Sequence, residues 1–453
     1  MFTTYNPATG LESARFAYHS QEHVKDCLGK AASAQAAWRY EPLSSRCGLL
    51  SRMATVLRAQ KERYAALISQ EMGKPIADAL AEIEKCAWNC DFYAENSGRF
   101  LAHDAFASDY TESFVSYDPL GVVLAIMPWN YPFWQVFRFL APALAAGNGV
   151  LLKHALNTPL CALATQEVFE QAGGPAGLFC ALLIDTPSIQ ALIDDERVAA
   201  ITLTGSTRVG AIVGSQSAKA LKKQVLELGG SDPFIVLADA DLPKSAKAAA
   251  KARFSNCGQA CINAKRFIVD RSVADTFVDL FAAEVSELKV GDPFDPMTNI
   301  GPLARHDIRE TLHHQVTRSI EEGAVLRAGG GYCDGPGFFY QPTILDHVLP
   351  SMTAFREETF GPLAAVVRAE GTEHAIRLAN DTEFGLGASI WTQDPELAKQ
   401  VACRIDAGAV FINSVVVSDP RFPFGGIKRS GYGRELGSLG IKEFTNAKTI
   451  VVS

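Results

Sequence analysis

Residues 121–154, "GVVLAIMPWNYPFWQVFRFLAPALAAGNGVLLKH", decide the fold. A short apolar run opens the stretch (121–130) and a second one closes it (149–154). Between them, residues 132–147 have the apolar spacing of a helix. Two short apolar strands joined through a helix are typical of a parallel sheet that is covered on both faces. This stretch therefore predicts an α/β fold.

The same alternation continues toward the C-terminus. A helix is predicted over 157–173, where Thr158 is placed to cap and Pro159 occupies the first helical position. Apolar strands are expected at 177–184, 198–205 and 223–230. Such a series forms a doubly wound parallel sheet, and ligands bind at the carboxyl ends of its strands.

The regions on either side of this sheet complete the domain organisation. Residues 20–96 read as helices and residues 111–127 as an extended segment. A second alternating block runs from Phe234 to Asn413, and the β-branched C-terminus is able to add a further strand. The boundary near residues 229–230 follows from this rhythm, because no linker composition marks it.

Composition excludes several classes of protein. The chain is 48% hydrophobic and 20% charged, as in ordinary globular proteins, and its net charge of −8 argues against a nucleic-acid-binding protein. Ten irregularly spaced cysteines in 453 residues suit a reducing compartment better than a disulfide framework. Neither a signal peptide nor a membrane span is recognisable, so we expect a cytoplasmic protein.

Cys257 and Cys261 lie four residues apart in "FSNCGQACINAKRFIVD" (254–270). They could be a metal site, a redox disulfide, two inert core thiols, or a nucleophile beside a bystander. Zinc is disfavoured because the nearest downstream histidine is His306. A buried thiol is the default for a cysteine, but the polar, glycine-containing turn around Cys261 is typical of a reactive one.

A nucleophilic cysteine needs a base and an oxyanion donor. Glu227 ends an apolar strand, where desolvation raises a carboxyl pKa toward that of a useful base. Asn130 follows another strand, where its amide can donate to an oxyanion. Each also has an ordinary structural interpretation: Glu227 as the partner of a lysine, Asn130 as a helix cap.

Six motifs occur in the order found in the aldehyde dehydrogenase superfamily, and the resemblance covers essentially the whole chain. The most detailed likeness is to the short bacterial succinate-semialdehyde dehydrogenases, which the chain resembles in "LLKHALN", "WQVFRFLAPALAAGN" and "FINSVVVSDPRFPFGG". The six motifs are "PWNYPFWQ", "LTGSTRVG", "LELGGSDPFIVLADADL", "NCGQACINAKRF", "EETFGP" and "PFGGIKRSGYGRE".

The resemblance implies a two-step oxidation. Cys261 matches the nucleophile that attacks the aldehyde carbonyl, and Asn130 and the backbone N–H of Cys261 would form the oxyanion hole. After hydride transfer to a nicotinamide, Glu227 would activate the water that hydrolyses the thioester, which favours a free acid as product. Cys257 has no role in this chemistry and is interpreted as a bystander.

The resemblance also implies a nicotinamide cofactor. The turn at Gly205, Ser206 and Gly210 follows a strand and opens a helix, whose N-terminus can bind phosphate. At the end of the second strand, Lys153 and the absence of an acid favour NADP over NAD. The predicted cofactor-binding residues are Pro128, Trp129, Lys153, His154, Asn157, Gly205, Ser206, Gly210, Leu228, Glu358 and Phe360.

For the substrate, Arg138 matches the arginine that binds the distal carboxylate of succinate semialdehyde, and Ser418 matches a serine that assists it. Trp134 and Phe424 would form the walls of the tunnel. Some relatives place a second arginine where this chain has Ser255, and Arg421 is a candidate to compensate. Glutarate semialdehyde or an uncharged aliphatic aldehyde therefore remains an alternative substrate.

The resemblance predicts a Rossmann-like cofactor domain (1–109 and 122–228) and an α/β catalytic domain (229–430). A small β oligomerisation element (110–121 and 431–453) would make a homodimer or homotetramer. The expected role is in 4-aminobutyrate breakdown, without nucleic acid, membrane or metal. A non-catalytic binding protein and a cysteine ester hydrolase are the remote alternatives.

Overall fold

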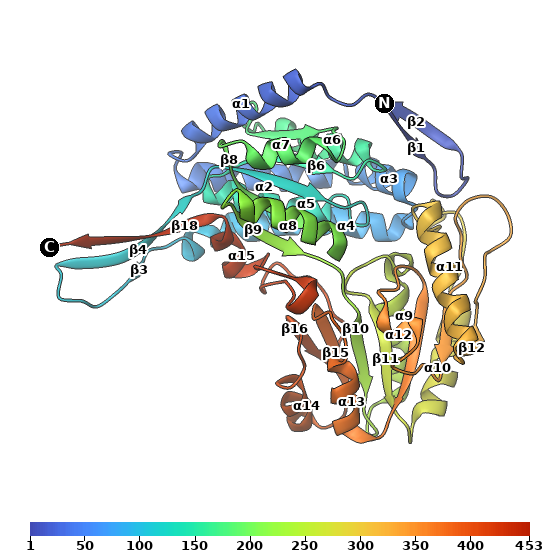
Figure 1. Cartoon of the computed structure of the whole chain (residues 1–453). Coiled ribbons are helices and arrows are strands. Elements are labelled where there is room, and N and C mark those ends of the chain that lie inside the picture. The colour runs from blue at the N-terminus through green and yellow to red at the C-terminus, as the bar shows by residue number, and fades with distance from the viewer.

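A computed structural model describes residues 1–453 as two α/β lobes and a projecting antiparallel arm (Figure 1). The first lobe contains a six-stranded sheet in the order β17-β9-β8-β5-β6-β7. All its strands are parallel except β17, which pairs antiparallel with β9. The five predicted parallel strands are thus confirmed. They are β5 (Val122–Met127), β6 (Gly149–His154), β7 (Phe179–Leu182), β8 (Val198–Thr204) and β9 (Lys223–Glu227), with β17 (Gly431–Tyr432) at the edge.

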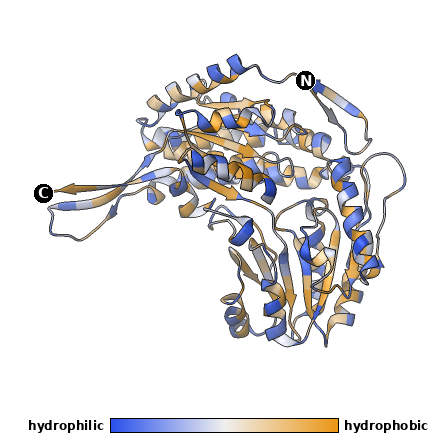
Figure 2. Ribbon diagram, viewed as in Figure 1, coloured by the Kyte–Doolittle hydropathy of each residue, from blue (hydrophilic) through white to orange (hydrophobic).

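Helices cover both faces of this sheet, and the sheet strands are largely apolar (Figure 2). The predicted N-terminal helices are present, and so are those between the strands. They are α1 (Gln21–Trp38), α2 (Leu43–Ala59), α3 (Lys61–Met72), α4 (Ile76–Phe100), α5 (Trp134–Ala146), α6 (Pro159–Gln171), α7 (Ser188–Asp194) and α8 (Thr207–Lys219).

The cap predicted for α6 is wrong. Thr158 stands at the N-cap position, but its side chain makes no capping hydrogen bond, because its hydroxyl bonds to Nδ1 of His154. The carboxylate of Glu71 in α3 caps the helix instead, accepting from the backbone N–H groups of Leu160 and Cys161 at 2.8 and 2.9 Å. A distant carboxylate thus satisfies the N-terminal donors of α6.

The second lobe contains a seven-stranded sheet in the order β12-β13-β14-β11-β10-β15-β16, parallel except for the β12–β13 pair. It confirms the second alternating block. The strands are β10 (Asp232–Val236), β11 (Ala264–Asp270), β12 (Val325–Ala328), β13 (Thr343–Asp346), β14 (Leu363–Ala369), β15 (Gly387–Trp391) and β16 (Ala409–Ile412). The helices are α9 (Leu242–Phe254), η1 (Ser255–Gly258), α10 (Ala274–Ser286), α11 (His306–Glu321), α12 (Thr353–Arg356), α13 (Gly371–Asn380), α14 (Pro395–Ala402) and η2 (Lys428–Ser430).

The arm is a three-stranded antiparallel sheet in the order β18-β4-β3, which projects from the first lobe with the C-terminus at its tip (Figure 1). The C-terminal strand β18 (Thr445–Val452) pairs along the whole of β4 (Glu112–Pro119). Short β3 (Asp104–Ala105) also pairs with β4, so the sheet begins before residue 110. Helix α15 (Gly437–Glu443) leads into the arm, and β1 (Phe2–Tyr5) and β2 (Glu12–Phe16) form an N-terminal hairpin.

Adjacent strands of the first lobe bring three of the predicted site residues to one sheet edge. Strand β8 lies between β5 and β9, parallel to both. Asn130 follows β5, Gly205 follows β8, and Glu227 ends β9. No helix is long and apolar enough to cross a membrane.

Candidate active site

A strained turn presents Cys261. After α9 the chain passes through left-handed conformations at Asn256 (φ 53°), Cys257 (φ 57°) and Gly258 (φ 71°). At Gly258 a Cβ atom would lie 2.2 Å from the carbonyl oxygen of Gly361, so only glycine fits. The two non-glycine residues each cost roughly 1–2 kcal/mol in this conformation. Asn256 helps to offset that cost, because its Nδ2 donates to the carbonyls of Asn130 and Gln259 at 2.9 and 3.1 Å.

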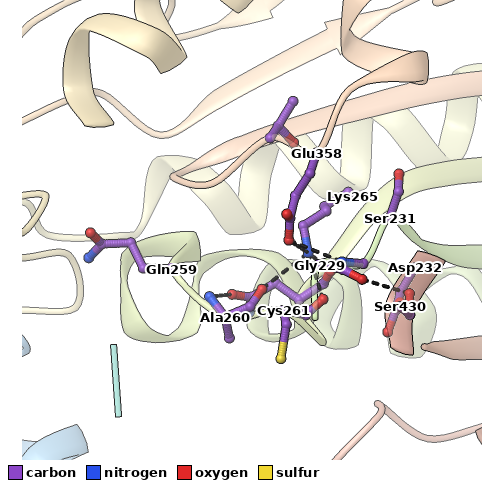
Figure 3. A network of polar contacts seen from close by, with 12 residues as sticks. Gly229, Ser231, Asp232, Gln259, Ala260, Cys261, Lys265, Glu358 and Ser430 are labelled. Atoms are coloured by element: carbon purple, nitrogen blue, oxygen red, sulfur yellow. Dashed lines mark hydrogen bonds and ion pairs between the residues drawn. The ribbon is translucent and has the colours of Figure 1, made fainter. Parts of the chain in front are cut away.

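Lys265 binds the backbone carbonyl groups at the end of this turn (Figure 3). Its fully buried ammonium donates to the carbonyl oxygens of Ala260 (3.1 Å) and Cys261 (2.7 Å), and it lies 3.8 Å from Oε1 of Glu358. The sulfur of Cys261 points away from this network (Figure 3). The sequence analysis missed Lys265. The signal was present in two consecutive cations, Lys265 and Arg266, next to the apolar run of strand β11.

The two cysteines of the turn have different environments. Burial raises the pKa of Cys261 to about 12, opposed by the charges of Arg138 and Lys265, so the free enzyme holds a protonated thiol. Cys257 is fully buried, and its sulfur accepts a hydrogen bond from the backbone N–H of Gly301 at 3.1 Å. All ten cysteines are free, so no disulfide joins the pair.

Glu227 is a buried carboxylate without a partner. It is 2% exposed, and neither carboxylate oxygen has a hydrogen-bond partner in the protein. Burial raises its pKa well above the usual value, while the charge of Arg138 opposes the shift. Gly425 leaves the carboxylate room, since a Cβ there would lie 2.6 Å from Oε1 of Glu227. These are the properties of a general base.

Two hydrogen-bond donors are available near the nucleophile. Nδ2 of Asn130 donates one hydrogen bond, to the carbonyl of Gln259 at 2.9 Å, which leaves its second N–H group free. The backbone N–H of Cys261 donates to no group of the protein. The pair can therefore stabilise an oxyanion on a carbon attacked by Cys261.

Cys261 lies where two cavities meet. One, of about 410 Å³, also contains Asn130 and draws its walls from both lobes. The other, of about 180 Å³, extends past α4 and α5. Apart from Cys261, only Gln135 lines both cavities. A reagent in each cavity would therefore reach the same sulfur from different sides.

The 410 Å³ cavity collects most of the predicted cofactor-binding residues. Trp129 and Phe360 meet edge to face there, with ring centroids 5.7 Å apart. Oε1 of Glu358 accepts from the backbone N–H of Gly230 at 3.1 Å. Ser206 caps α8, whose N-terminus opens on this cavity. The predicted residues that line it are Pro128, Trp129, Gly205, Ser206, Leu228, Glu358 and Phe360.

His154 and Gly210 line neither the 410 Å³ cavity nor the larger cavity of about 790 Å³ beside it. The two ring nitrogens of His154 bond to the carbonyl of Pro132 and the hydroxyl of Thr158, and burial lowers its pKa to about 4. At Gly210 a Cβ would lie 2.3 Å from the side chain of Leu228, so this glycine lets α8 pack closely on β9. Both residues therefore have structural roles in the elements that surround the cofactor-side cavities.

Lys153 and Asn157 line a neighbouring cavity of about 790 Å³, which shares Arg305 with the 410 Å³ cavity. The Nδ2 of Asn157 is buried and has no hydrogen-bond partner. An unsatisfied buried donor is costly unless a ligand pairs with it. Together with the helix N-terminus at Ser206, this donor fits a long, polar, phosphate-bearing ligand such as a dinucleotide.

The four predicted substrate residues all line the 180 Å³ cavity. Arg138 is 2% exposed, forms an ion pair with Glu435 and lies over the ring of Phe424, 4.8 Å from its centroid. Ser418 accepts hydrogen bonds from Nε1 of Trp134 (3.0 Å) and from Nζ of Lys85 (2.8 Å). Lys85 also lines the cavity and was not among the predicted residues.

The model of the aldehyde dehydrogenase family matches residues 1–450. The chain belongs to the aldehyde dehydrogenase family. Among aldehyde dehydrogenases, it is 51% identical over 99% of both chains to the Synechocystis sp. protein named "Probable succinate-semialdehyde dehydrogenase" for NADP(+). It is 47% identical to the succinate semialdehyde dehydrogenase for NAD(P)+ of Escherichia coli K12, covering 98% of this chain and 96% of that one.

A solved aldehyde dehydrogenase structure confirms the predicted fold. Succinic semialdehyde dehydrogenase from Streptococcus pyogenes, crystallised with NADP+ as the cofactor, superposes with a TM-score of 0.98 at 37% identity. The superposition covers 100% of both chains.

Proposed function

We propose that this aldehyde dehydrogenase oxidises succinate semialdehyde to succinate, with NADP favoured and NAD as the alternative acceptor. The observation that carries the proposal is the position of Cys261. It lies between the 410 Å³ cavity, which collects most of the predicted cofactor-binding residues, and a smaller cavity that is lined by cations and no acid. The relatives named for succinate semialdehyde and NADP(+) support the same substrate and cofactor.

The chemistry follows from the residues around Cys261. The Cys261 thiol gives its proton to the carboxylate of Glu227, which releases it to solvent, and the sulfur adds to the aldehyde carbon. Nδ2 of Asn130 and the Cys261 N–H donate to the resulting oxyanion, and such a donor is worth roughly 3–4 kcal/mol. A nicotinamide bound between Trp129, Glu358 and Phe360 would supply the hydride acceptor. Departure of the hydride to that acceptor would leave a thioester on Cys261. Glu227 then removes a proton from the water that attacks the thioester carbon and passes it to the sulfur, so that Cys261 leaves as a thiol and the acid is released.

Preference for NADP is proposed from the charges in the 790 Å³ cavity. Lys153 lies at the end of β6 and forms no salt bridge, so its ammonium is free for a 2′-phosphate. Asp307, the one acid lining this cavity, is already ion-paired with Arg305. The unpartnered Nδ2 of Asn157 supplies a further donor.

Preference for a semialdehyde is proposed from the 180 Å³ cavity. Trp134, Val416 and Phe424 give it apolar walls, while Arg138 and Ser418 provide polar groups. An aldehyde with a short apolar chain that ends in a carboxylate matches this arrangement. Glutarate semialdehyde and an uncharged aliphatic aldehyde are the competing substrates.

We further propose a cytoplasmic homodimer or homotetramer that acts in 4-aminobutyrate breakdown. The ten free cysteines support a reducing compartment. The projecting arm supports association, because Val451 and Val452 at the end of β18 are exposed apolar residues.

The test is the absorbance of the reduced nicotinamide, measured with succinate semialdehyde, glutarate semialdehyde and butyraldehyde, each with NADP and NAD. The highest kcat/KM is expected for succinate semialdehyde with NADP. Cys261→Ala should abolish turnover while Cys257→Ala retains most of it. A kcat/KM as high for butyraldehyde would refute the substrate proposal, and turnover by Cys261→Ala would refute the mechanism.

A further inference from the structure

All the charged residues that line the 180 Å³ cavity are positively charged. Three cations line it: Lys85 from α4, Arg138 from α5 and Lys251 from α9. None of the other residues that line it is an acid. Lys251 is exposed, so solvent screens its charge. The buried Arg138 and the half-buried Lys85 therefore determine which ligands the cavity accepts.

The charge of Arg138 is already partly neutralised. Its guanidinium forms an ion pair with Glu435, and both side chains are 2% exposed. Its Nη2 donates a further hydrogen bond to the hydroxyl of Thr204 at 3.2 Å. Strong pairing with a protein carboxylate leaves Arg138 less able to pay for the desolvation of a second one.

Lys85 has no such partner. No carboxylate lies within 4 Å of its ammonium, and its only hydrogen bond goes to the neutral hydroxyl of Ser418 at 2.8 Å. The ammonium lies 4.1 Å from the centroid of the Trp134 ring, which holds it in place. Because an ammonium has three donors, two N–H groups remain available to a ligand.

The other charged groups that act on Lys85 leave it uncompensated. Glu82 on its own helix is bound to Lys74, and Asp419 is bound to Arg421. Cys86 on α4 has a pKa raised by burial and is neutral, while Arg138 on α5 repels the ammonium. Burial lowers the pKa of Lys85 to about 8, and a carboxylate bound beside it would raise that pKa again.

Ser418 is oriented to complete an anion site. Its oxygen accepts from both Lys85 and Nε1 of Trp134, so both lone pairs are occupied. The hydroxyl hydrogen has no acceptor among the protein groups and is left to donate. A carboxylate at this position would accept from the Ser418 O–H and from the free N–H groups of Lys85.

We infer that Lys85 and Ser418 together bind the distal carboxylate of the substrate, with Arg138 as a second, partly neutralised cation behind them. Lys85 would then set the specificity for an aldehyde acid over an uncharged aldehyde. The inference rests on the proposed function and identifies the residue that selects its substrate.

The test compares kcat/KM for succinate semialdehyde and butyraldehyde in the wild type and in Lys85→Met, which keeps the length of the side chain without the charge. Loss of a charge-assisted hydrogen bond predicts a fall of about 10- to 100-fold for the semialdehyde. The value for butyraldehyde should change less than about threefold. Lys85→Arg should recover part of the preference. Lys247→Met should retain it and is the matched control, because Lys247 is exposed on α9 and does not line the cavity.

Binding of succinate gives a readout that does not depend on turnover. Succinate should raise the Tm of the wild type and of Lys247→Met but not that of Lys85→Met, whose own Tm shows whether it is folded. A wild type without preference for the semialdehyde overturns the proposed substrate and the inference together. A preference that survives in Lys85→Met overturns the role of Lys85 alone, as would an equal loss for both aldehydes.

Discussion

The ammonium of Lys265 donates a hydrogen bond to the backbone carbonyl of Cys261 across 2.7 Å. The same ammonium lies 3.8 Å from Oε1 of Glu358, one of the residues that we assign to nicotinamide binding. One buried cation thus joins the nucleophile's loop to the cofactor-side cavity (Figure 3). Lys265 positions both groups, although it faces neither cavity itself.

Replacing Lys265 with Met should misplace Cys261. The substitution removes hydrogen bonds from a charged donor, each worth about 1.5–3 kcal/mol, and leaves the carbonyls of Ala260 and Cys261 without their buried partner. We expect kcat to fall at least about tenfold and the rate of Cys261 alkylation by iodoacetamide to change. Lys247→Met is the control, because Lys247 is exposed and lies outside both cavities. A Lys265→Met enzyme with normal kcat and alkylation would show that the contact is dispensable.

Glu227→Gln should separate activity from stability. The glutamine cannot act as a base, so steady-state turnover should fall by about 10²–10⁴-fold. In the wild type, kcat should rise with pH through the raised pKa of Glu227, at higher pH than for an ordinary glutamate, and this limb should vanish in the variant. An unchanged pH profile in Glu227→Gln would exclude Glu227 as the base.

The stability effect of the same variant has the opposite sign. A carboxyl whose pKa is raised in the folded state makes the protein less stable as the pH rises from the unfolded pKa toward the folded one. Gln does not titrate, so Glu227→Gln should have a higher Tm than the wild type near pH 8. The gain should shrink as the pH approaches 4.5, and thermal melts across this range would measure it.

The sequence predicted what depends on local pattern. Apolar runs located β5 to β9, and their ends located Asn130, Gly205 and Glu227. What it missed are contacts between distant segments. Lys85 and Ser418 are 333 residues apart, and a lysine on an amphipathic helix ordinarily indicates a solvated face.

Contacts between distant segments also explain two other differences from the sequence prediction, the partner of Arg138 and the cap of α6. Glu435 meets Arg138 only because the C-terminal segment folds back against α5. Thr158 has the residue type of a helix cap, but the competing carboxylate of Glu71 comes from α3. Pairings of this kind require the tertiary fold.

Gly229→Ala should weaken cofactor binding while leaving the fold intact. A Cβ at this position would lie 2.4 Å from Oε2 of Glu358, a flexible carboxylate that would have to move. We expect KM for the nicotinamide to rise several-fold with little change in Tm. Gly98→Ala in α4 is the matched control, since a Cβ there would lie 4.0 Å from the side chain of Leu43 in α2. An equal rise in KM in both variants would contradict the role of Glu358.

The Arg138–Glu435 pair should behave as a unit. Arg138→Met leaves a buried carboxylate unpaired, so the free energy of unfolding should fall by about 3–5 kcal/mol and both aldehydes should be oxidised more slowly. The double variant Arg138→Met/Glu435→Gln should recover much of that loss, which chemical denaturation would measure. If the loss of unfolding free energy in the double variant equals the sum of the losses in the two single variants, the pair is not coupled.

The most direct test of the central claim is mass spectrometry of Glu227→Gln, quenched within one turnover after mixing with succinate semialdehyde and NADP. Because the variant forms the thioester but hydrolyses it slowly, a succinyl group should be found on the peptide that contains Cys261. Replacing Cys261 with Ala in that variant should remove the adduct, and replacing Cys257 should not. A succinyl group on another residue, or none while reduced nicotinamide accumulates, would contradict covalent oxidation at Cys261.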